Sequence, residues 1–281
     1  MVKKFGLVLF TLAVVSQALP AGAAVPATVT IPPGEAEAKT ALEKSPRHHE
    51  WVSIPVPGVN TKVSAFVAYP ERKDKAPVVI VIQEVYGLTD WIRAVADRLA
   101  GEGFIAIAPD LLSGKGPGGG GTEKFASRDD VVKAVRDLTP AEVAAALDAV
   151  SRYGRGLPAA KDKVGTVGFC WGGGQSFLYA TVQPGLAAAV VYYGTSPALE
   201  ALGAIRAPVL GLYGEDDARV NATVGPAAAK MKELGKMFVT HTYKGAGHGF
   251  LRAQDGRDGA NLEASRQAWP ATVEFLKKYL E

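Results

Sequence analysis

The chain is poor in residue types that would indicate several common functions. It has one cysteine, Cys170, among 281 residues, so no disulfide can form within it. Its formal net charge is only +3, and two of the positive charges, Lys3 and Lys4, lie in a segment that we expect to be removed. Composition therefore gives no support for binding to nucleic acid or to an anionic membrane. A lone cysteine is then either a buried, inert thiol or a working one.

Long apolar runs are also missing. The stretch 7–15 is apolar but too short to span a bilayer, and no later segment is a convincing transmembrane helix. Lys3 and Lys4 precede this stretch, and the small residues Ala21-Gly22-Ala23 follow it. The pattern predicts a signal peptide over residues 1–23, cleaved near Ala23 or Ala24, with an uncleaved anchor as the alternative. We therefore expect an exported protein, periplasmic or secreted, without a membrane span after cleavage.

The remaining chain divides into an arm and one domain. Residues 24–50 are rich in Ala, Pro and Glu without firm periodicity, which predicts a loosely packed arm with a short helix around Glu35–Lys44. From residue 51 to 281, strand-like and helix-like patterns alternate. Such alternation predicts the α/β class, with a mainly parallel sheet covered by helices on both faces. We expect strands at 51–56, 62–69, 77–83, 104–108, 164–169, 187–193, 208–213 and 238–243, and helices at 90–100, 128–138, 140–153, 172–182, 224–234 and 261–279.

A glycine-rich loop at 114–121 could be mistaken for a phosphate-binding loop. It lacks the Gly-Lys-Ser/Thr ending and the strand–loop–helix spacing of that motif. We interpret it instead as a flexible loop bordering the active site.

The strongest motif surrounds the cysteine. Gly168-Phe169-Cys170-Trp171-Gly172 lies between a predicted strand and a predicted helix, as in the G-x-S-x-G nucleophile elbow with Cys in place of Ser. The elbow is a sharp, strained turn that leaves no room for side chains two residues away. It also aims the Trp171 N–H at a developing oxyanion, and the helix amino end favours the thiolate. A buried structural cysteine on a tight turn is the alternative.

An acid and a histidine follow in order. Asp216 and Asp217 come directly after a late strand, where this fold places the residue that orients the histidine. His248 lies among glycines on a loop after the next strand, a position that suits a mobile base better than core packing. The chain order of nucleophile, acid and histidine is that of the α/β-hydrolase fold. These elements together predict a catalytic triad.

The loop after strand 77–83 should supply the second oxyanion donor, and the Val85 N–H is the natural candidate. Glu84 places a carboxylate at the end of this buried strand, close to the nucleophile. It either caps a helix or forms a salt bridge, or it tunes the protonation of Cys170 or pairs with a nearby arginine.

From about Trp51 to its end, the chain resembles the dienelactone hydrolase (carboxymethylenebutenolidase) family. The matching motifs are Gln83-Glu84-Val85-Tyr86-Gly87, Ala108-Pro109-Asp110-Leu111, Gly168-Phe169-Cys170-Trp171-Gly172-Gly173, Gly214-Glu215-Asp216-Asp217 and Gly247-His248-Gly249-Phe250. The resemblance implies an α/β-hydrolase fold with a mainly parallel central sheet.

The resemblance also implies roles for individual residues. The family pattern G-x-x-D selects Asp217 for a triad with Cys170 and His248. Glu84 would hold the thiol proton in the resting state, and Arg252, four residues after His248, would bind a substrate carboxylate. The backbone amides of Val85 and Trp171 would form the oxyanion hole. A second carboxylate-binding residue falls after Asp110, where Lys115, Lys124 and Arg128 are all possible.

These features predict a monomeric hydrolase that cleaves a small ester or lactone through a thioester acyl-enzyme. We expect no cofactor and no metal, because no His, Asp or Cys spacing typical of zinc sites occurs. The alternatives are a general carboxylesterase or thioesterase of the same fold, and a non-catalytic binding protein or thiol sensor.

Overall fold

The computed structural model describes residues 30–281. The predicted signal peptide at 1–23 and the first residues of the arm lie outside the described residues. Among those described, no helix combines the length and the apolar character that crossing a membrane requires.

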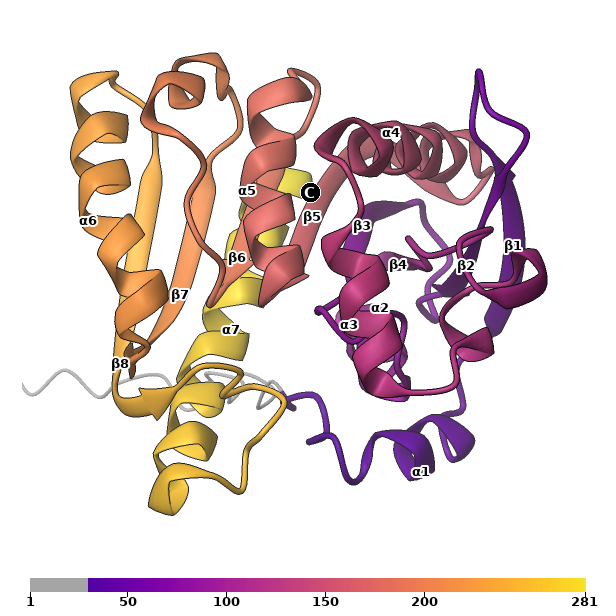
Figure 1. Cartoon of the computed structure of the whole chain (residues 1–281), viewed down its shortest axis with the longest axis horizontal. Helices are drawn as coiled ribbons and strands as arrows, with labels where there is room; N and C mark the ends of the chain where they lie inside the picture. The colour runs from indigo at the N-terminus through magenta and orange to yellow at the C-terminus, as the bar shows by residue number, and fades with distance from the viewer. Residues whose placement is uncertain (1–29) are drawn as a thin grey trace, which may run out of the picture.

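One sheet organises the described residues (Figure 1). Its eight strands follow the order β1-β2-β4-β3-β5-β6-β7-β8. The pairs β1/β2 and β2/β4 are antiparallel and the other neighbours are parallel. The strands are β1 (His49–Pro55), β2 (Lys62–Ala68), β3 (Ala76–Ile82), β4 (Ile105–Pro109), β5 (Ala160–Phe169), β6 (Ala188–Tyr192), β7 (Val209–Asp216) and β8 (Phe238–Gly247).

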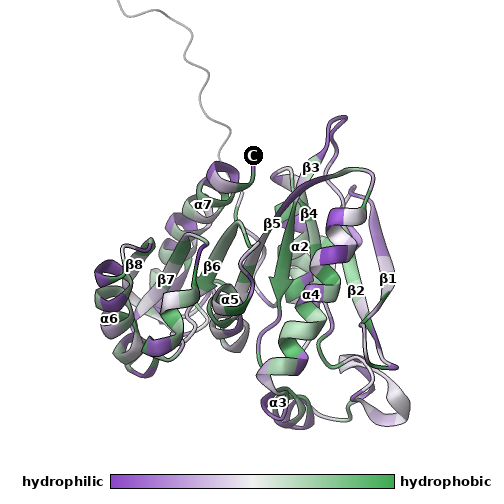
Figure 2. Cartoon of the chain, turned by 90° about the horizontal axis from the view of Figure 1, so that it is seen from above, coloured by the Kyte–Doolittle hydropathy of each residue, from purple (hydrophilic) through white to green (hydrophobic). Residues whose placement is uncertain are grey.

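Helices cover both faces of the sheet, which is why its central strands are apolar throughout. Every residue of β3 is buried, as a strand with helices above and below requires. One face packs against α1, α2 and α7, and the other against α4, α5 and α6. Figure 2 shows hydrophobic residues concentrated on the central strands, whereas α3 is largely hydrophilic. The helices are α1 (Ala38–Glu43), α2 (Asp90–Gly101), α3 (Arg128–Arg136), α4 (Pro140–Gly156), α5 (Trp171–Val182), α6 (Ala218–Glu233) and α7 (Ala260–Leu280).

The helices and strands predicted from the sequence lie close to the observed ones, and local caps explain several of the observed boundaries. Thr89 Oγ1 accepts a hydrogen bond from the Ile92 N–H at the start of α2, and Thr139 with Glu142 forms a capping box on α4. The helix α6 begins at Ala218 rather than at residue 224, because Asp217 accepts from the Val220 N–H and caps the helix earlier. The strand β8 continues to Gly247, four residues beyond the predicted end.

The prediction of a loosely packed arm is wrong for residues 30–48, which we call the N-terminal segment. The short helix exists as α1, but its Ala38 is fully buried in the core beside α2. The Trp91 indole N–H donates to Pro33 O over 3.1 Å. The segment is fixed because its backbone carbonyls accept hydrogen bonds from buried donors. A periodic pattern of side chains does not predict such contacts.

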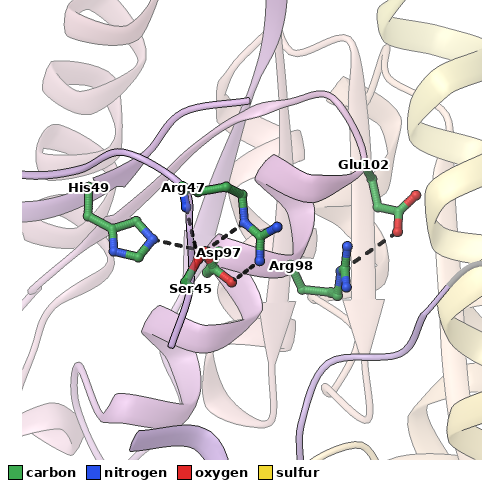
Figure 3. Close-up of polar contacts among 6 residues, drawn as sticks. All are labelled: Ser45, Arg47, His49, Asp97, Arg98 and Glu102. Atoms are coloured by element: carbon green, nitrogen blue, oxygen red, sulfur yellow. Dashed lines mark hydrogen bonds and ion pairs between the residues drawn. The ribbon is translucent and has the colours of Figure 1, made fainter. Parts of the chain in front are cut away.

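The far end of this segment is anchored on Asp97 of α2 (Figure 3). The Asp97 carboxylate accepts from Ser45 Oγ over 2.6 Å and from Arg47 Nε over 2.7 Å, and lies 2.8 Å from His49 Nε2. Burial alone would raise the pKa of Asp97, but the hydrogen bonds from Arg47, Ser45 and His49 outweigh it and lower the pKa. The segment therefore belongs to the domain.

Candidate active site

Cys170 lies at the sharp turn between β5 and α5, with φ 56° and ψ −117°. Two glycines make this turn possible. A Cβ atom added at Gly168 would lie 1.9 Å from Gly172 O, and one added at Gly172 would lie 2.2 Å from Gln83 O. These are backbone contacts that cannot yield, so the motif needs glycine at both positions. A strained non-glycine residue held in this way is typical of a functional site.

The thiol faces a cavity of about 530 Å³ lined by residues of several loops. Burial raises the pKa of Cys170, and the negative charge of Glu84 raises it further. Hydrogen bonds to the sulfur from the backbone amides of Trp171 and Val85 act in the opposite direction. The net effect is a raised pKa, which favours the protonated thiol over the thiolate. The two amides that the sequence predicts as oxyanion donors thus converge on the sulfur.

Asp217 and His248 contact each other, and the His248 ring packs against Tyr193, which lines this cavity. Asp217 Oδ2 lies 2.6 Å from His248 Nδ1, and the carboxylate is buried. Asp216, the other sequence candidate, points elsewhere and lies 2.8 Å from Arg257 Nη1. The pairing of β7 with β8, which aligns Asp216 with Gly247, brings the acid loop and the histidine loop together. An acid that holds one ring nitrogen leaves the other free to exchange a proton.

Glu84 is almost completely buried at the end of β3, and its partner among the described residues is Arg252. The distance from Arg252 Nε to Glu84 Oε2 is 2.7 Å. Burial raises the pKa of Glu84 to about 7, although Arg252 opposes the shift and Glu35 adds to it. The sequence left open whether Glu84 pairs with an arginine or tunes the thiol. Its geometry permits both, since it contacts Arg252 and acts electrostatically on Cys170.

Arg128, one of the three sequence candidates after Asp110, shares two partners with Arg252, namely Glu35 and Tyr86. Both guanidinium groups lie over the Tyr86 ring, with their Cζ atoms 3.5 Å (Arg128) and 5.3 Å (Arg252) from its centroid. Lys115, another sequence candidate, instead pairs with Glu142. The structure thus brings Arg128 and Arg252 together on Tyr86, the residue that follows Val85.

The glycine-rich loop lies at a different place. It lines a second cavity, of about 600 Å³, together with Trp51 and Arg93. The end of the loop is tied to Asp110, whose carboxylate accepts from both the N–H and the hydroxyl of Thr122, each over 2.7 Å. The loop therefore lies beside the end of β4 and does not line the Cys170 cavity, contrary to the prediction that it borders the active site.

Sequence reasoning missed several residues that line the Cys170 cavity, among them Arg136, Tyr193 and Arg219. Tyr193 has φ 38° and is fully buried, and its ring centroid lies 5.2 Å from that of His248. Its place directly after β6 was the available signal, because functional groups gather at the carboxyl ends of parallel strands. Arg136 ends α3, and nothing in the sequence marks it.

No group of three or more His, Cys, Asp or Glu residues that could hold a metal ion occurs within residues 30–281. The polar centre described above is made of a thiol, two carboxylates, an imidazole and guanidinium groups.

Comparisons with known proteins relate the chain to one family. Residues 63–280 match the dienelactone hydrolase family. A protein of Salmonella typhimurium assigned as a carboxymethylenebutenolidase is 30% identical over 270 residues, which cover 90% of this chain and 98% of that protein. An Escherichia coli protein of the same assignment is 31% identical over 242 residues, covering 82% of this chain and 86% of that one.

Solved structures extend the comparison. A Klebsiella pneumoniae protein assigned as a dienelactone hydrolase has a TM-score of 0.72 and 30% identity, and the match covers 83% of this chain and 99% of that chain. The acylaminoacyl peptidase of Pyrococcus horikoshii has a TM-score of 0.67 at 17% identity, covering 87% of this chain and 43% of that chain. The second likeness concerns the fold alone, which is the α/β-hydrolase fold.

Proposed function

Because the chain belongs to the dienelactone hydrolase family and is thus a hydrolytic enzyme, we propose that it cleaves a small carboxylic ester or lactone through Cys170, His248 and Asp217. The observation that carries the proposal is the Cys170 elbow, whose sulfur faces the amides of Val85 and Trp171. Such donors stabilise the oxyanion of an acyl-transfer intermediate.

The reaction begins with a proton transfer. His248, oriented by Asp217, takes the thiol proton, and the thiolate attacks the carbonyl carbon. The carbonyl oxygen becomes an oxyanion facing the two amides. When the tetrahedral intermediate collapses, the carbon–oxygen bond breaks, and His248 returns the proton to the alkoxide leaving group. Water, deprotonated by His248, then hydrolyses the thioester and releases the carboxylic acid and the thiol.

Glu84 supports the resting state in this proposal. Its pKa of about 7 lets the buried carboxylate exchange a proton near neutral pH. Its charge also disfavours the Cys170 thiolate, so the nucleophile forms only when the proton distribution around it changes. This arrangement would protect the thiolate from unproductive reactions between turnovers.

The decisive experiment combines activity with detection of the acyl-enzyme. The Cys170→Ala variant should lose at least about 10³-fold in kcat/KM on a 4-nitrophenyl ester, because the nucleophile and its activation are lost together. Mass spectrometry of the wild type, rapidly quenched during turnover, should find the acyl group on Cys170. An alanine variant with full activity would refute the cysteine mechanism, whereas an oxidised Cys170 without acyl turnover would favour a thiol sensor.

A general carboxylesterase or thioesterase of the same fold is the second candidate, favoured by the polar cavity that Thr195 and Gln175 line beside Cys170. A panel of lactones, oxygen esters and thioesters compared by kcat/KM separates it from a lactone-selective enzyme. Preference for open-chain esters over every lactone tested would support this candidate.

We also propose that the protein is exported after removal of residues 1–23 and acts as a monomer. The motivating pattern is the charged start, short apolar run and small-residue site of the N-terminus. Cell fractionation with N-terminal sequencing should find a mature chain starting near Ala24 outside the cytoplasm, and light scattering should give the mass of one chain. An intact N-terminus in the cytoplasmic fraction would contradict export.

A further inference from the structure

The carboxylate of Glu35 lies between two arginines that are distant in sequence. Its Oε2 contacts Arg252 Nη1, and its Oε1 lies 3.3 Å from Arg128 Nη2. Both arginines also lie over the Tyr86 ring. Two guanidinium groups converging on one carboxylate, with an aromatic face to order them, form a typical carboxylate-binding site. In this protein the chain itself supplies the carboxylate.

This site adjoins the chemistry. Arg252 reaches inward from Glu35 to the buried Glu84, 2.7 Å from its Nε. Glu84 is followed by Val85, whose amide faces the Cys170 sulfur, and then by Tyr86. An acidic group held by the two arginines would therefore lie beside the oxyanion donors.

The position of Glu35 is set by the path of the N-terminal segment. The Glu35 N–H donates to Arg252 O over 3.0 Å, and the Gln254 side-chain amide donates to Pro32 O over 2.9 Å. The Asp97 contacts fix the other end of the segment. An intramolecular ligand held in this way competes at an effective concentration of about millimolar or more. The Glu35 side chain is nevertheless 40% exposed, and an open cavity of about 530 Å³ lies beside it.

We propose that Glu35 is a specificity-determining residue that occupies the Arg128–Arg252 carboxylate site and makes the enzyme favour uncharged esters and lactones over acidic ones. The proposal rests on the proposed function, because it assigns the substrate class of the same site. An acidic substrate must displace Glu35 before both arginines can bind it. An uncharged substrate meets no such competition.

The kinetic test uses Glu35→Gln, which keeps the shape of the side chain and removes its charge. The substrates are 4-nitrophenyl hydrogen glutarate, which carries a carboxylate, and the uncharged 4-nitrophenyl butyrate. The ratio of kcat/KM for the acidic ester to that for the uncharged ester should rise about tenfold or more, mainly through a lower KM for the acidic ester. Adding Arg128→Gln should abolish the gain, because the freed site then lacks one arginine.

Glu43→Gln is the matched control, since Glu43 is an exposed glutamate in the same segment with no ion pair among the described residues. It should leave the ratio at the wild-type value. An unchanged ratio in Glu35→Gln, or an equal rise in the control, would overturn the proposal. Unfolding curves of each variant show whether the fold is retained. Glu35→Asp keeps the charge on a side chain that is one methylene shorter, and it should give a ratio between those of the wild type and Glu35→Gln.

Binding measured without turnover separates this proposal from the proposed function. Isothermal titration of glutarate into Cys170→Ala and into the Cys170→Ala, Glu35→Gln double variant should show binding about tenfold tighter in the latter. The uncharged glutaramide should bind both equally. If Cys170→Ala keeps esterase activity while glutarate behaves as expected, the cysteine mechanism fails and the role of Glu35 stands. Equal binding of glutarate to both proteins refutes the role of Glu35.

Discussion

Replacing Glu84 by glutamine should make the protein more stable at alkaline pH. The carboxyl is almost completely buried, and its pKa is about 7 against an ordinary value of 4.5. A folded-state pKa above the unfolded value means that stability is greatest below the unfolded value and falls as pH rises through the folded one. Glutamine imitates the protonated carboxyl, so its stability should not follow this fall.

The magnitude follows from the shift. A difference of about 2.5 pKa units corresponds to about 3 kcal/mol at 1.36 kcal/mol per unit. Most of this loss should occur between about pH 5 and pH 8 in the wild type, because that interval lies between and just beyond the two pKa values. Arg252 retains a partner in the variant, since it also pairs with Glu35.

Urea unfolding followed by tryptophan fluorescence at pH 5 and pH 8.5 measures the effect. The difference in unfolding free energy between Glu84→Gln and the wild type should be larger at pH 8.5 by about 2 to 3 kcal/mol. Glu43→Gln, at an exposed position, should show no such change with pH. If the two pH values give the same difference for Glu84→Gln, the carboxyl does not have a raised pKa, and its proposed proton exchange near neutral pH is wrong.

Three other substitutions test separate parts of the site and the fold. Asp217→Asn should lower kcat/KM by about 10²-fold or more while the Asp216→Asn control stays within about twofold, because Asp217 alone contacts His248; equal losses would argue against this assignment. Gly172→Ala should lower stability by about 2 kcal/mol and kcat by about 10²-fold, since its Cβ would lie 2.2 Å from a backbone oxygen; wild-type thermal unfolding and rates would contradict the clash. Asp97→Asn should lower the unfolding free energy at pH 7 by about 2 kcal/mol. Because the pKa of Asp97 is lowered, that stabilisation is present above about pH 4 and disappears as pH falls through the folded pKa, which acid titration of both proteins can follow.

The sequence predicted the parts of the site that follow from local geometry. The elbow at Cys170 can be recognised from the sequence because close backbone contacts, such as that between Gly168 and Gly172, leave room only for glycine. The order of Cys170, the acid and His248 places them at the same edge of a parallel sheet. The buried strand β3 is equally plain from its unbroken apolar run.

The parts that escaped prediction depend on three-dimensional contacts between distant segments. Local sequence alone does not distinguish Asp216 from Asp217; the family resemblance selected Asp217, and the pairing of β7 with β8 brings it to His248. Arg128 could not be distinguished from other cations after Asp110 until its place over Tyr86 was known. Glu35 lies 217 residues from Arg252, and no local pattern connects them.

The way in which the N-terminal segment is attached bears on how the enzyme could diversify. Near the site, the segment is held mainly through backbone atoms, with Trp91 donating to Pro33 O and Gln254 to Pro32 O. Because every residue type offers the same carbonyl, position 35 can change without altering the path of the chain. Substrate preference could thus evolve by single replacements at a residue outside the triad. With the proposed role of Glu35, the selection of the substrate would vary independently of Cys170, Asp217 and His248.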